Sequence, residues 1–240
     1  MRGKVGKGLS GVLALALCMG MTACAGGADA PAQTSSPQPM QQVEATPQPT
    51  AQAAPTPAKF SSAAVMEQLD VKKYIYTSMN SNFAALAITN HSEFVIDIDA
   101  SAKLTKGGTP QGAEQGMAFN VEPEQTAVVR FVTEAEFDEF EYALSISQVR
   151  VDEYYMGYTS HIDYDVTSDG KTATVVLANT GDRNAMADCT VLFFKGDTLV
   201  DIGQVGADLQ PGDEATQFVS AFHDKSFDTV QAYVSAITLD

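Results

Sequence analysis

Histidine and cysteine, the side chains that most often carry catalysis, are few and widely spaced in this sequence. The histidines are His91, His161 and His223, and no His-Glu-x-x-His string joins any of them. Because a metal-assisted enzyme needs clustered ligands, this spacing predicts solvated loop histidines rather than a metal site. The sequence also lacks a Gly-x-Ser-x-Gly string and a Gly-rich phosphate loop. It therefore predicts no enzyme, no metal and no cofactor.

Cys189 is a candidate nucleophile only by residue type. It lies within Ala187–Val191, where strand alternation would place its side chain on one face with Ala187 and Val191. A cysteine on an apolar face, with no histidine close in sequence, is typical of core packing. We therefore expect Cys189 to be buried.

Acidic residues offer two candidate calcium sites. Asp165–Gly170 begins like an EF-hand loop, but its twelfth position is Val176 where a bidentate Glu is required. Asp169-Gly170 between two strand-like runs is better explained as a hairpin turn. A second group of carboxylates would hold a cation only if a loop folded around it, and a solvated acidic edge is expected instead: Glu134, Glu136, Asp138, Glu139 and Glu141.

Tyrosines form the most suggestive group of candidate binding residues. Four of them crowd the start of the second half of the chain: Tyr154, Tyr155, Tyr158 and Tyr164. Tyrosine is an amphipathic contact residue that suits glycans or protein partners. Cross-strand pairing and packing between domains is the alternative interpretation.

A short apolar run near the N-terminus indicates export. Three basic residues and no acidic residue lie in Met1–Lys7, and the run Leu9–Ala23 spans 15 residues. About 20 apolar residues are needed to cross a bilayer as a helix. A charged start, a short apolar core and small residues at its end are typical of a signal peptide. Residues 1–23 are therefore expected to be removed. An ordinary secretory signal, cut at an Ala-x-Ala-like site, is the alternative.

Met21-Thr22-Ala23-Cys24 resembles the lipobox of bacterial lipoproteins, with Met21 where that family usually has Leu. The resemblance implies cleavage between Ala23 and Cys24 and attachment of diacylglycerol to the Cys24 thiol, with palmitate as a typical acyl chain. Each buried methylene contributes about 0.8 kcal/mol, so two or three acyl chains would hold the protein durably. We expect a lipid-anchored protein on the extracytoplasmic face of the cell membrane.

The charge of the chain excludes several partners. The formal net charge is −16, and the loss of Arg2, Lys4 and Lys7 with the signal takes three positive charges away, giving −19. Nucleic-acid binding needs clustered Lys and Arg, so no nucleic-acid partner is expected. An acidic body is repelled by an anionic membrane face, which leaves membrane contact to the lipid. Only Cys189 would accompany Cys24 after processing, so no internal disulfide is expected.

Residues 24–59 are expected to form a lipidated Cys24 followed by a disordered linker. The segment is rich in Ala, Gln, Ser, Thr and Pro, and seven of the ten prolines lie in it. It has few large side chains, so burial cannot offset its conformational entropy. At about 3.1 Å per residue its extended length is roughly 100 Å. A Pro-rich recognition ligand is the alternative.

The remaining residues show internal similarity. Four pairs of segments occur in the same order at offsets of 89, 88, 87 and 90 residues: Ala85–Asn90 with Thr174–Asn179, Val121–Pro123 with Leu209–Pro211, Phe131–Thr133 with Phe218–Ser220, and Phe137-Asp138 with Phe227-Asp228. The pattern predicts two tandem units, at 60–148 and 149–240.

Each unit reads as short strands bounded by turn residues. Apart from a short helix within Ser61–Leu69, we expect no helix in either unit. Val95–Leu104 and Ala185–Phe194 are expected to be strands that end at glycine turns. A loop is expected to follow each strand, leading to a turn at Pro123 or Pro211. The sequence predicts an all-β protein with two antiparallel β-sandwiches.

This order of strands and turns resembles the immunoglobulin-like, FxLYD-type domains of bacterial surface lipoproteins. Val191–Asp197 is the segment most similar to their motif, although no segment contains a complete Phe-x-Leu-Tyr-Asp string. The resemblance implies a β-sandwich with no established catalytic residues. It adds to the fold prediction and names no ligand.

Together these features predict a membrane-anchored, non-enzymatic interaction or structural module at the cell surface, with a cell-wall or protein partner. The alternative is a ligand-capturing lipoprotein that serves a transporter or an envelope complex. Typical solute-binding lobes alternate helices with strands, and that pattern is absent from this sequence. An envelope enzyme, with residues that converge only in the folded chain, is a third hypothesis.

Overall fold

The structure is a computed structural model that describes residues 59–150, 156–222 and 225–239. Most of these residues lie in antiparallel strands, and all of them belong to one compact unit. The predictions for Cys24, the signal segment, the linker, Tyr154, Tyr155 and His223 concern residues outside the described ranges. None of the helices in the described part of the chain has the length and apolar character needed to cross a membrane.

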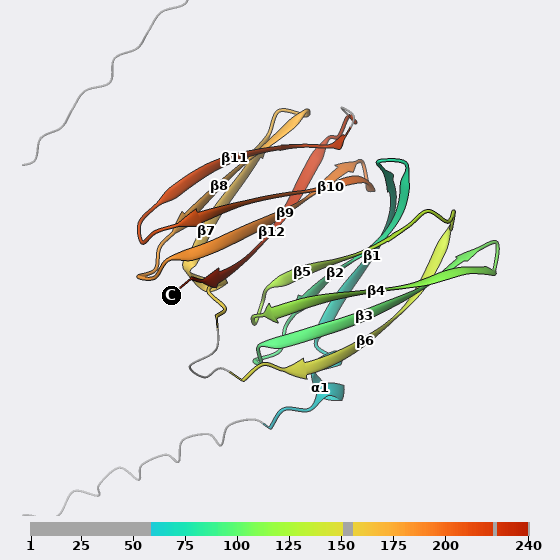
Figure 1. The fold of residues 1–240 in the computed structure, drawn as a ribbon, viewed down its shortest axis with the longest axis horizontal. Helices are drawn as coiled ribbons and strands as arrows, with labels where there is room; N and C mark the ends of the chain where they lie inside the picture. The colour runs from blue at the N-terminus through green and yellow to red at the C-terminus, as the bar shows by residue number, and fades with distance from the viewer. Residues whose placement is uncertain (1–58, 151–155, 223–224, 240) are drawn as a thin grey trace, which may run out of the picture. The chain divides into compact units, whose positions relative to one another are not determined.

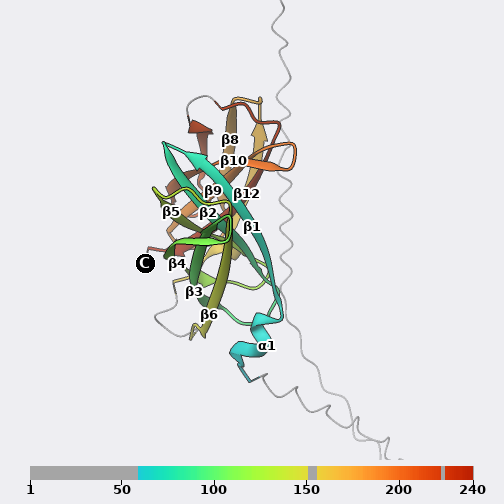
Figure 2. The same cartoon turned by 90° about the vertical axis from the view of Figure 1, so that its right-hand side faces the viewer.

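The first sandwich consists of two three-stranded sheets (Figure 1). One sheet has the order β1-β2-β5, with β1 at Leu69–Ser78, β2 at Ser81–Asn90 and β5 at Thr126–Thr133. The other has the order β4-β3-β6, with β4 at Thr109–Val121, β3 at Ile96–Lys106 and β6 at Glu139–Gln148. Helix α1, at Ser62–Met66, lies at the end of this sandwich beside β6 (Figure 2).

The second sandwich repeats this arrangement of strands. Its first sheet has the order β11-β8-β7, with β7 at Ile162–Ser168, β8 at Thr172–Asn179 and β11 at Glu214–Ser220. Its other sheet has the order β10-β9-β12, with β9 at Ala185–Lys195, β10 at Thr198–Leu209 and β12 at Thr229–Thr238. A short 3-10 helix, η1 at Thr159–His161, precedes β7.

The prediction of two antiparallel immunoglobulin-like sandwiches is confirmed. In immunoglobulin lettering, β1-β2-β5 follows the order A-B-E, and β4-β3-β6 follows the order C′-C-F. Within the described residues, neither sandwich has a strand in the G position. Each sandwich is therefore a six-strand version of the fold.

Alternating apolar residues from both sheets fill the core of each sandwich. In β8 the side chains of Ala173, Val175 and Leu177 are fully buried. Cys189 lies in the same core on β9, as its place in the alternation predicts. Burial raises the pKa of the Cys189 thiol to about 11, which keeps it protonated and unreactive at neutral pH.

A buried asparagine closes the same turn in both sandwiches. The Asn90 side-chain nitrogen donates to the carbonyl oxygens of Phe94 and Val121, at 2.8 and 3.0 Å. Asn179 donates in the same way to Arg183 and Leu209, at 2.8 and 3.2 Å. Each side-chain oxygen accepts a backbone N–H two residues further along the chain. A strand-ending Asn therefore ties the end of its own strand to the following loop and to the end of a second strand in each unit.

One sheet of each sandwich packs against the other sandwich. Tyr76 and Ala85, from the sheet β1-β2-β5, are buried with Leu192, Phe194 and Ile202, from the sheet β10-β9-β12. The rings of Tyr74 and Phe194 meet edge to face, with centroids 5.7 Å apart. A further hydrogen bond of 2.8 Å joins Arg130 to Gln204 across this junction.

Two strands were expected as loops from the sequence. The segments expected as loops before Pro123 and Pro211 are the strands β4 and β10. Most side chains of β4 are exposed, so its sequence has no apolar alternation to mark it as a strand. The short helix expected within Ser61–Leu69 is confirmed as α1, which ends at Met66 because Leu69 already begins to pair with Asn90.

The proposed alignment of Phe131 with Phe218 is wrong by one residue. Phe131 pairs with Ala84, and the corresponding partner of Ala173 in the second sandwich is Val219. A shift of one residue exchanges the two faces of a strand. Phe131 is consequently buried, whereas Phe218 lies on the outer face of its sheet with 68% of its surface exposed.

Candidate functional site

The turn between β4 and β5, at Glu122–Gln125, is folded around the side chain of Gln125. The backbone N–H of Glu122 donates to the side-chain oxygen of Gln125 at 2.8 Å. The backbone N–H of Gln125 donates to the carbonyl oxygen of Glu122 at 3.1 Å. Glu124 has a positive φ of 62°, which completes this tight reversal. The turn thereby directs the amide nitrogen of Gln125 toward the second sandwich.

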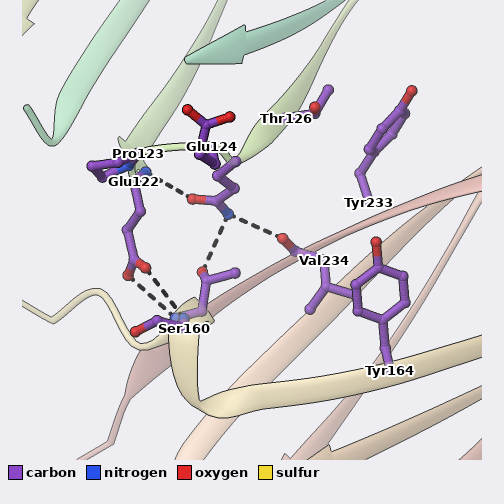
Figure 3. A pocket seen from close by; sticks show the side chains of 10 residues that line it. Glu122, Pro123, Glu124, Thr126, Ser160, Tyr164, Tyr233 and Val234 are labelled. Atoms are coloured by element: carbon purple, nitrogen blue, oxygen red, sulfur yellow. Dashed lines mark hydrogen bonds between the residues drawn. The ribbon is translucent and has the colours of Figure 1, made fainter. Parts of the chain in front are cut away.

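Gln125 and Glu122 connect the two sandwiches (Figure 3). The Gln125 side-chain nitrogen donates to the Thr159 hydroxyl at 3.2 Å and to the carbonyl oxygen of Val234 at 3.0 Å. The Glu122 carboxylate accepts the backbone N–H groups of Thr159 and Ser160, both at 3.2 Å. The first N–H groups of a helical turn have no partner within it. The first sandwich therefore supplies the hydrogen-bond acceptor for the first backbone N–H groups of η1 in the second sandwich.

A hollow of about 300 Å³ opens beside this connection. The turn forms one side, while Tyr164 and Tyr233 lie on the other (Figure 3). Tyr164 is 49% exposed, and its hydroxyl donates to the carbonyl oxygen of Ala232 at 3.4 Å. The hollow thus combines two aromatic rings with hydroxyl and carboxylate groups.

A second hollow of about 270 Å³ adjoins the first and shares Gln125, Thr126, Tyr233 and Val234 with it. Its other side chains include the exposed Phe119 of β4 and several neutral polar groups: Thr190, Gln204 and Ser235. None of its lining residues carries a charge. We call the two hollows together the junction cleft.

The open edge of β12, which borders the junction cleft, already has hydrogen-bond partners. The carbonyl of Val234 accepts from Gln125, and the N–H of Ala236 donates to the Thr159 hydroxyl at 2.9 Å. Tyr158 donates its N–H to the carbonyl of Ala236 at 2.8 Å. These bonds occupy positions at which an added strand would pair.

The two histidines that the structure describes, His91 and His161, contact a surface carboxylate and a tyrosine ring. The His91 Nδ1 atom lies 2.8 Å from the Glu124 carboxylate in an exposed contact. The ring of His161 packs on Tyr158 with centroids 4.5 Å apart. In the described part of the chain, no group of three His, Cys, Asp or Glu residues is placed to hold a metal ion.

Asp169-Gly170 forms the hairpin turn that its sequence predicts. The Asp169 carboxylate accepts the backbone N–H groups of Thr172 and Lys171, at 2.8 and 2.9 Å. These bonds hold the pKa of Asp169 below its ordinary value. Gly170 has a φ of 83°, a conformation that glycine adopts without strain.

The two described tyrosines of the predicted binding group have different places. Tyr158 is buried in the core of the second sandwich, and its hydroxyl accepts the backbone N–H of Arg183 at 2.9 Å. It is therefore a packing residue and does not form part of an exposed surface. Tyr164 faces the junction cleft.

The other residues of the junction cleft have no signature in the sequence. Glu122 and Gln125 read as an ordinary Pro-containing turn, and the partners of Gln125 lie as far as 109 residues away. One local signal is the apolar pair Met117 and Phe119, in a segment that lacks other large side chains.

Comparisons with known proteins identify no family. No family model matches the chain, and no curated protein matches it. Among solved structures, the chain is similar to the C-terminal globular domain of an oligosaccharyltransferase from Pyrococcus abyssi, with 8% identity and a TM-score of 0.18. The match covers 66% of this chain and 42% of that one. A likeness this weak carries no argument about function.

Proposed function

We propose that the protein is a membrane-anchored, extracytoplasmic lipoprotein that acts by binding and not by catalysis. The observation that carries the proposal is Cys24, which follows Met21-Thr22-Ala23 at the end of a 15-residue apolar run. Lipid attachment at Cys24 would place both sandwiches outside the membrane on a Pro-rich tether.

The arrangement of reactive groups supports a binding role. The Cys189 thiol is buried, and its raised pKa keeps it protonated. The Glu122 carboxylate is engaged by the N–H groups of η1, and Glu124 is engaged by His91. Covalent catalysis needs an accessible nucleophile beside a base. The junction cleft offers rings, hydroxyls and carboxamides, together with these two engaged carboxylates.

Mass spectrometry of the protein purified from its native membrane fraction tests the anchor. The expected result is an N-terminal fragment that begins at Cys24 and carries diacylglycerol. Cys24→Ala should abolish that modification and release the protein from the membrane fraction. An unmodified N-terminus in the native protein would overturn the proposal.

Ligand capture for a transporter or an envelope complex is the second candidate function. The junction cleft favours it, because a concave site with a few polar groups is typical of small-ligand binding. A protein that captures a ligand is stabilised by it. A rise in melting temperature with an added ligand would support this role, and the absence of any shift across a panel of solutes would argue against it.

A further inference from the structure

We infer that the junction cleft binds an uncharged oligosaccharide. The inference rests on the proposed binding role and names the chemical class of ligand for that site. It comes from three properties of the cleft: the absence of charged residues around its second hollow, the exposure of aromatic rings and the occupied edge of β12.

The charge of the cleft differs from that of the chain. The protein has a net charge of −16, yet the hollow bounded by Phe119, Thr190 and Ser235 has no charged lining residue. In the adjoining hollow, the Glu122 and Glu124 carboxylates already have partners. An anionic ligand is repelled by the surrounding field, and a cationic ligand finds no free carboxylate at the second hollow. The cleft therefore fits a neutral ligand.

Aromatic side chains are exposed where a ligand would rest. Phe119 is 62% exposed and Tyr164 is 49% exposed, and they belong to different sandwiches. The C–H faces of sugar rings pack on aromatic faces, while sugar hydroxyls bond to neutral polar groups. Thr190 and Ser235 supply hydroxyls beside Phe119, whereas the Gln204 carboxamide is bonded to Arg130 and Thr190. Gln125 lines both hollows, so a chain of linked sugars that occupied both would pass over the Gln125 side chain.

The backbone of β12 argues against an extended peptide in this position. Strand addition depends on main-chain hydrogen bonds along an open edge. The Val234 carbonyl and both backbone groups of Ala236 already have partners. Recognition in the cleft therefore depends on side chains, as it does for saccharides.

Calorimetric titration of the purified mature chain with cellotetraose and with N-acetylated chitotetraose tests the inference, with tetragalacturonate as an anionic comparison. We expect saturable binding of at least one neutral probe and none of the anionic one. Phe119→Ser should weaken binding about tenfold, as expected for the loss of an aromatic anchor. Phe218→Ser is the matched control, because Phe218 is 68% exposed on a different sheet and should leave affinity unchanged.

Three outcomes would overturn the inference: no binding of either neutral probe, equal binding of the anionic probe, or equal losses in both variants. Unchanged melting temperatures in the two variants would show that each remains folded. If the chain carries lipid on Cys24 and Phe119→Ser abolishes capture of an envelope protein while no saccharide binds, the proposed binding role stands and the saccharide assignment falls. If Cys24 is unmodified and a neutral probe binds, the membrane anchor falls and the saccharide site stands.

Discussion

The two sandwiches share one strand order but differ on the faces that meet at the junction. In the sheet β10-β9-β12, the outward-facing Leu192, Phe194 and Ile202 are buried against the first sandwich. The strand registers place Lys103, Thr105 and Ala113 at the corresponding positions of the sheet β4-β3-β6, where the face is open to solvent. One fold therefore carries an apolar outer face only where a neighbour covers it.

The second pair of sheets follows the same rule. Tyr74, Phe83 and Ala85 face the junction from β1 and β2. The corresponding residues of β7 and β8 are Thr167, Thr172 and Thr174, on an uncovered face. Repeat proteins end in units with a polar outer face because an apolar one would stay exposed. The two sandwiches accordingly form a stack whose outer faces are mainly polar, with Phe218 on β11 and Met117 on β4 as exposed apolar exceptions.

Truncation of a side chain at the junction should have the largest effect on stability of the substitutions considered. Leu192→Ala should lower the free energy of unfolding by about 3 kcal/mol, through lost burial and a cavity. Lys103→Ala, at the corresponding open position, should change it by less than roughly 0.5 kcal/mol. Urea unfolding of both variants measures the difference. Equal effects would mean that the junction contributes nothing to stability.

The buried asparagines are a feature that the two sandwiches share, so their substitution should affect both sandwiches equally. Asn90→Ala and Asn179→Ala each remove two hydrogen bonds to backbone carbonyl oxygens. Each should cost about 2 kcal/mol of folding free energy. Thermal unfolding of the two variants should give similar losses. A large loss at one position and none at the other would show that the shared turn is structural in only one sandwich.

The strands whose side chains alternate were predictable from the sequence, and so were the residues that end them. Asn90 and Asn179 mark the ends of β2 and β8, and Asp169-Gly170 marks a hairpin. Val191–Phe194 breaks the alternation because both faces of β9 are covered there, which is typical of a doubly buried strand. An unbroken apolar run in an otherwise alternating strand is thus the mark that the junction leaves in the sequence.

The junction cleft was not predictable in the same way. Gln125 and Asp213 occupy equivalent turns, and each bonds the N–H of the residue three positions before it. The neighbouring sequence does not show which of the two turns bonds to the other sandwich, since the partners of Gln125 lie far along the chain, in η1 and β12. The alignment of Phe218 with Phe131 was wrong for a related reason. A Phe-Val pair on an edge strand fits either face until its hydrogen-bond partner is known.

Substitutions at these two turns should cost less folding free energy, and the two costs should differ. Gln125→Ala removes the turn bond from the Glu122 N–H and the bonds to Thr159 and Val234, at a cost of about 1.5 kcal/mol. Asp213→Ala removes one exposed turn bond and should cost about 0.5 kcal/mol. Denaturant unfolding checks both values. A larger loss at Asp213 would contradict the assigned role of Gln125.

The last effect is absent near neutral pH and appears only in alkaline solution, where Tyr76 distinguishes the junction from the open faces. Burial raises the pKa of Tyr76 to about 12, from an ordinary value of 10.0. Below pH 10 the phenol is neutral in both states, and its contribution to stability is fully present. Between pH 10 and 12 the unfolded chain loses this proton while the folded chain keeps it. Stability therefore falls as pH rises through that interval.

Tyr76→Phe should cost about 1 kcal/mol near pH 7, through the lost hydrogen bond with Arg130, and make the alkaline decline shallower. The decline should not vanish, because burial also raises the pKa values of Tyr74 and Tyr233. Unfolding free energies measured at several pH values up to 12 test this, with Tyr142→Phe as the control outside the junction. An identical alkaline slope in wild type and Tyr76→Phe would mean that this phenol is not buried between the sandwiches. The aromatic face of β1 would then be open, like the threonine face of β7 and β8.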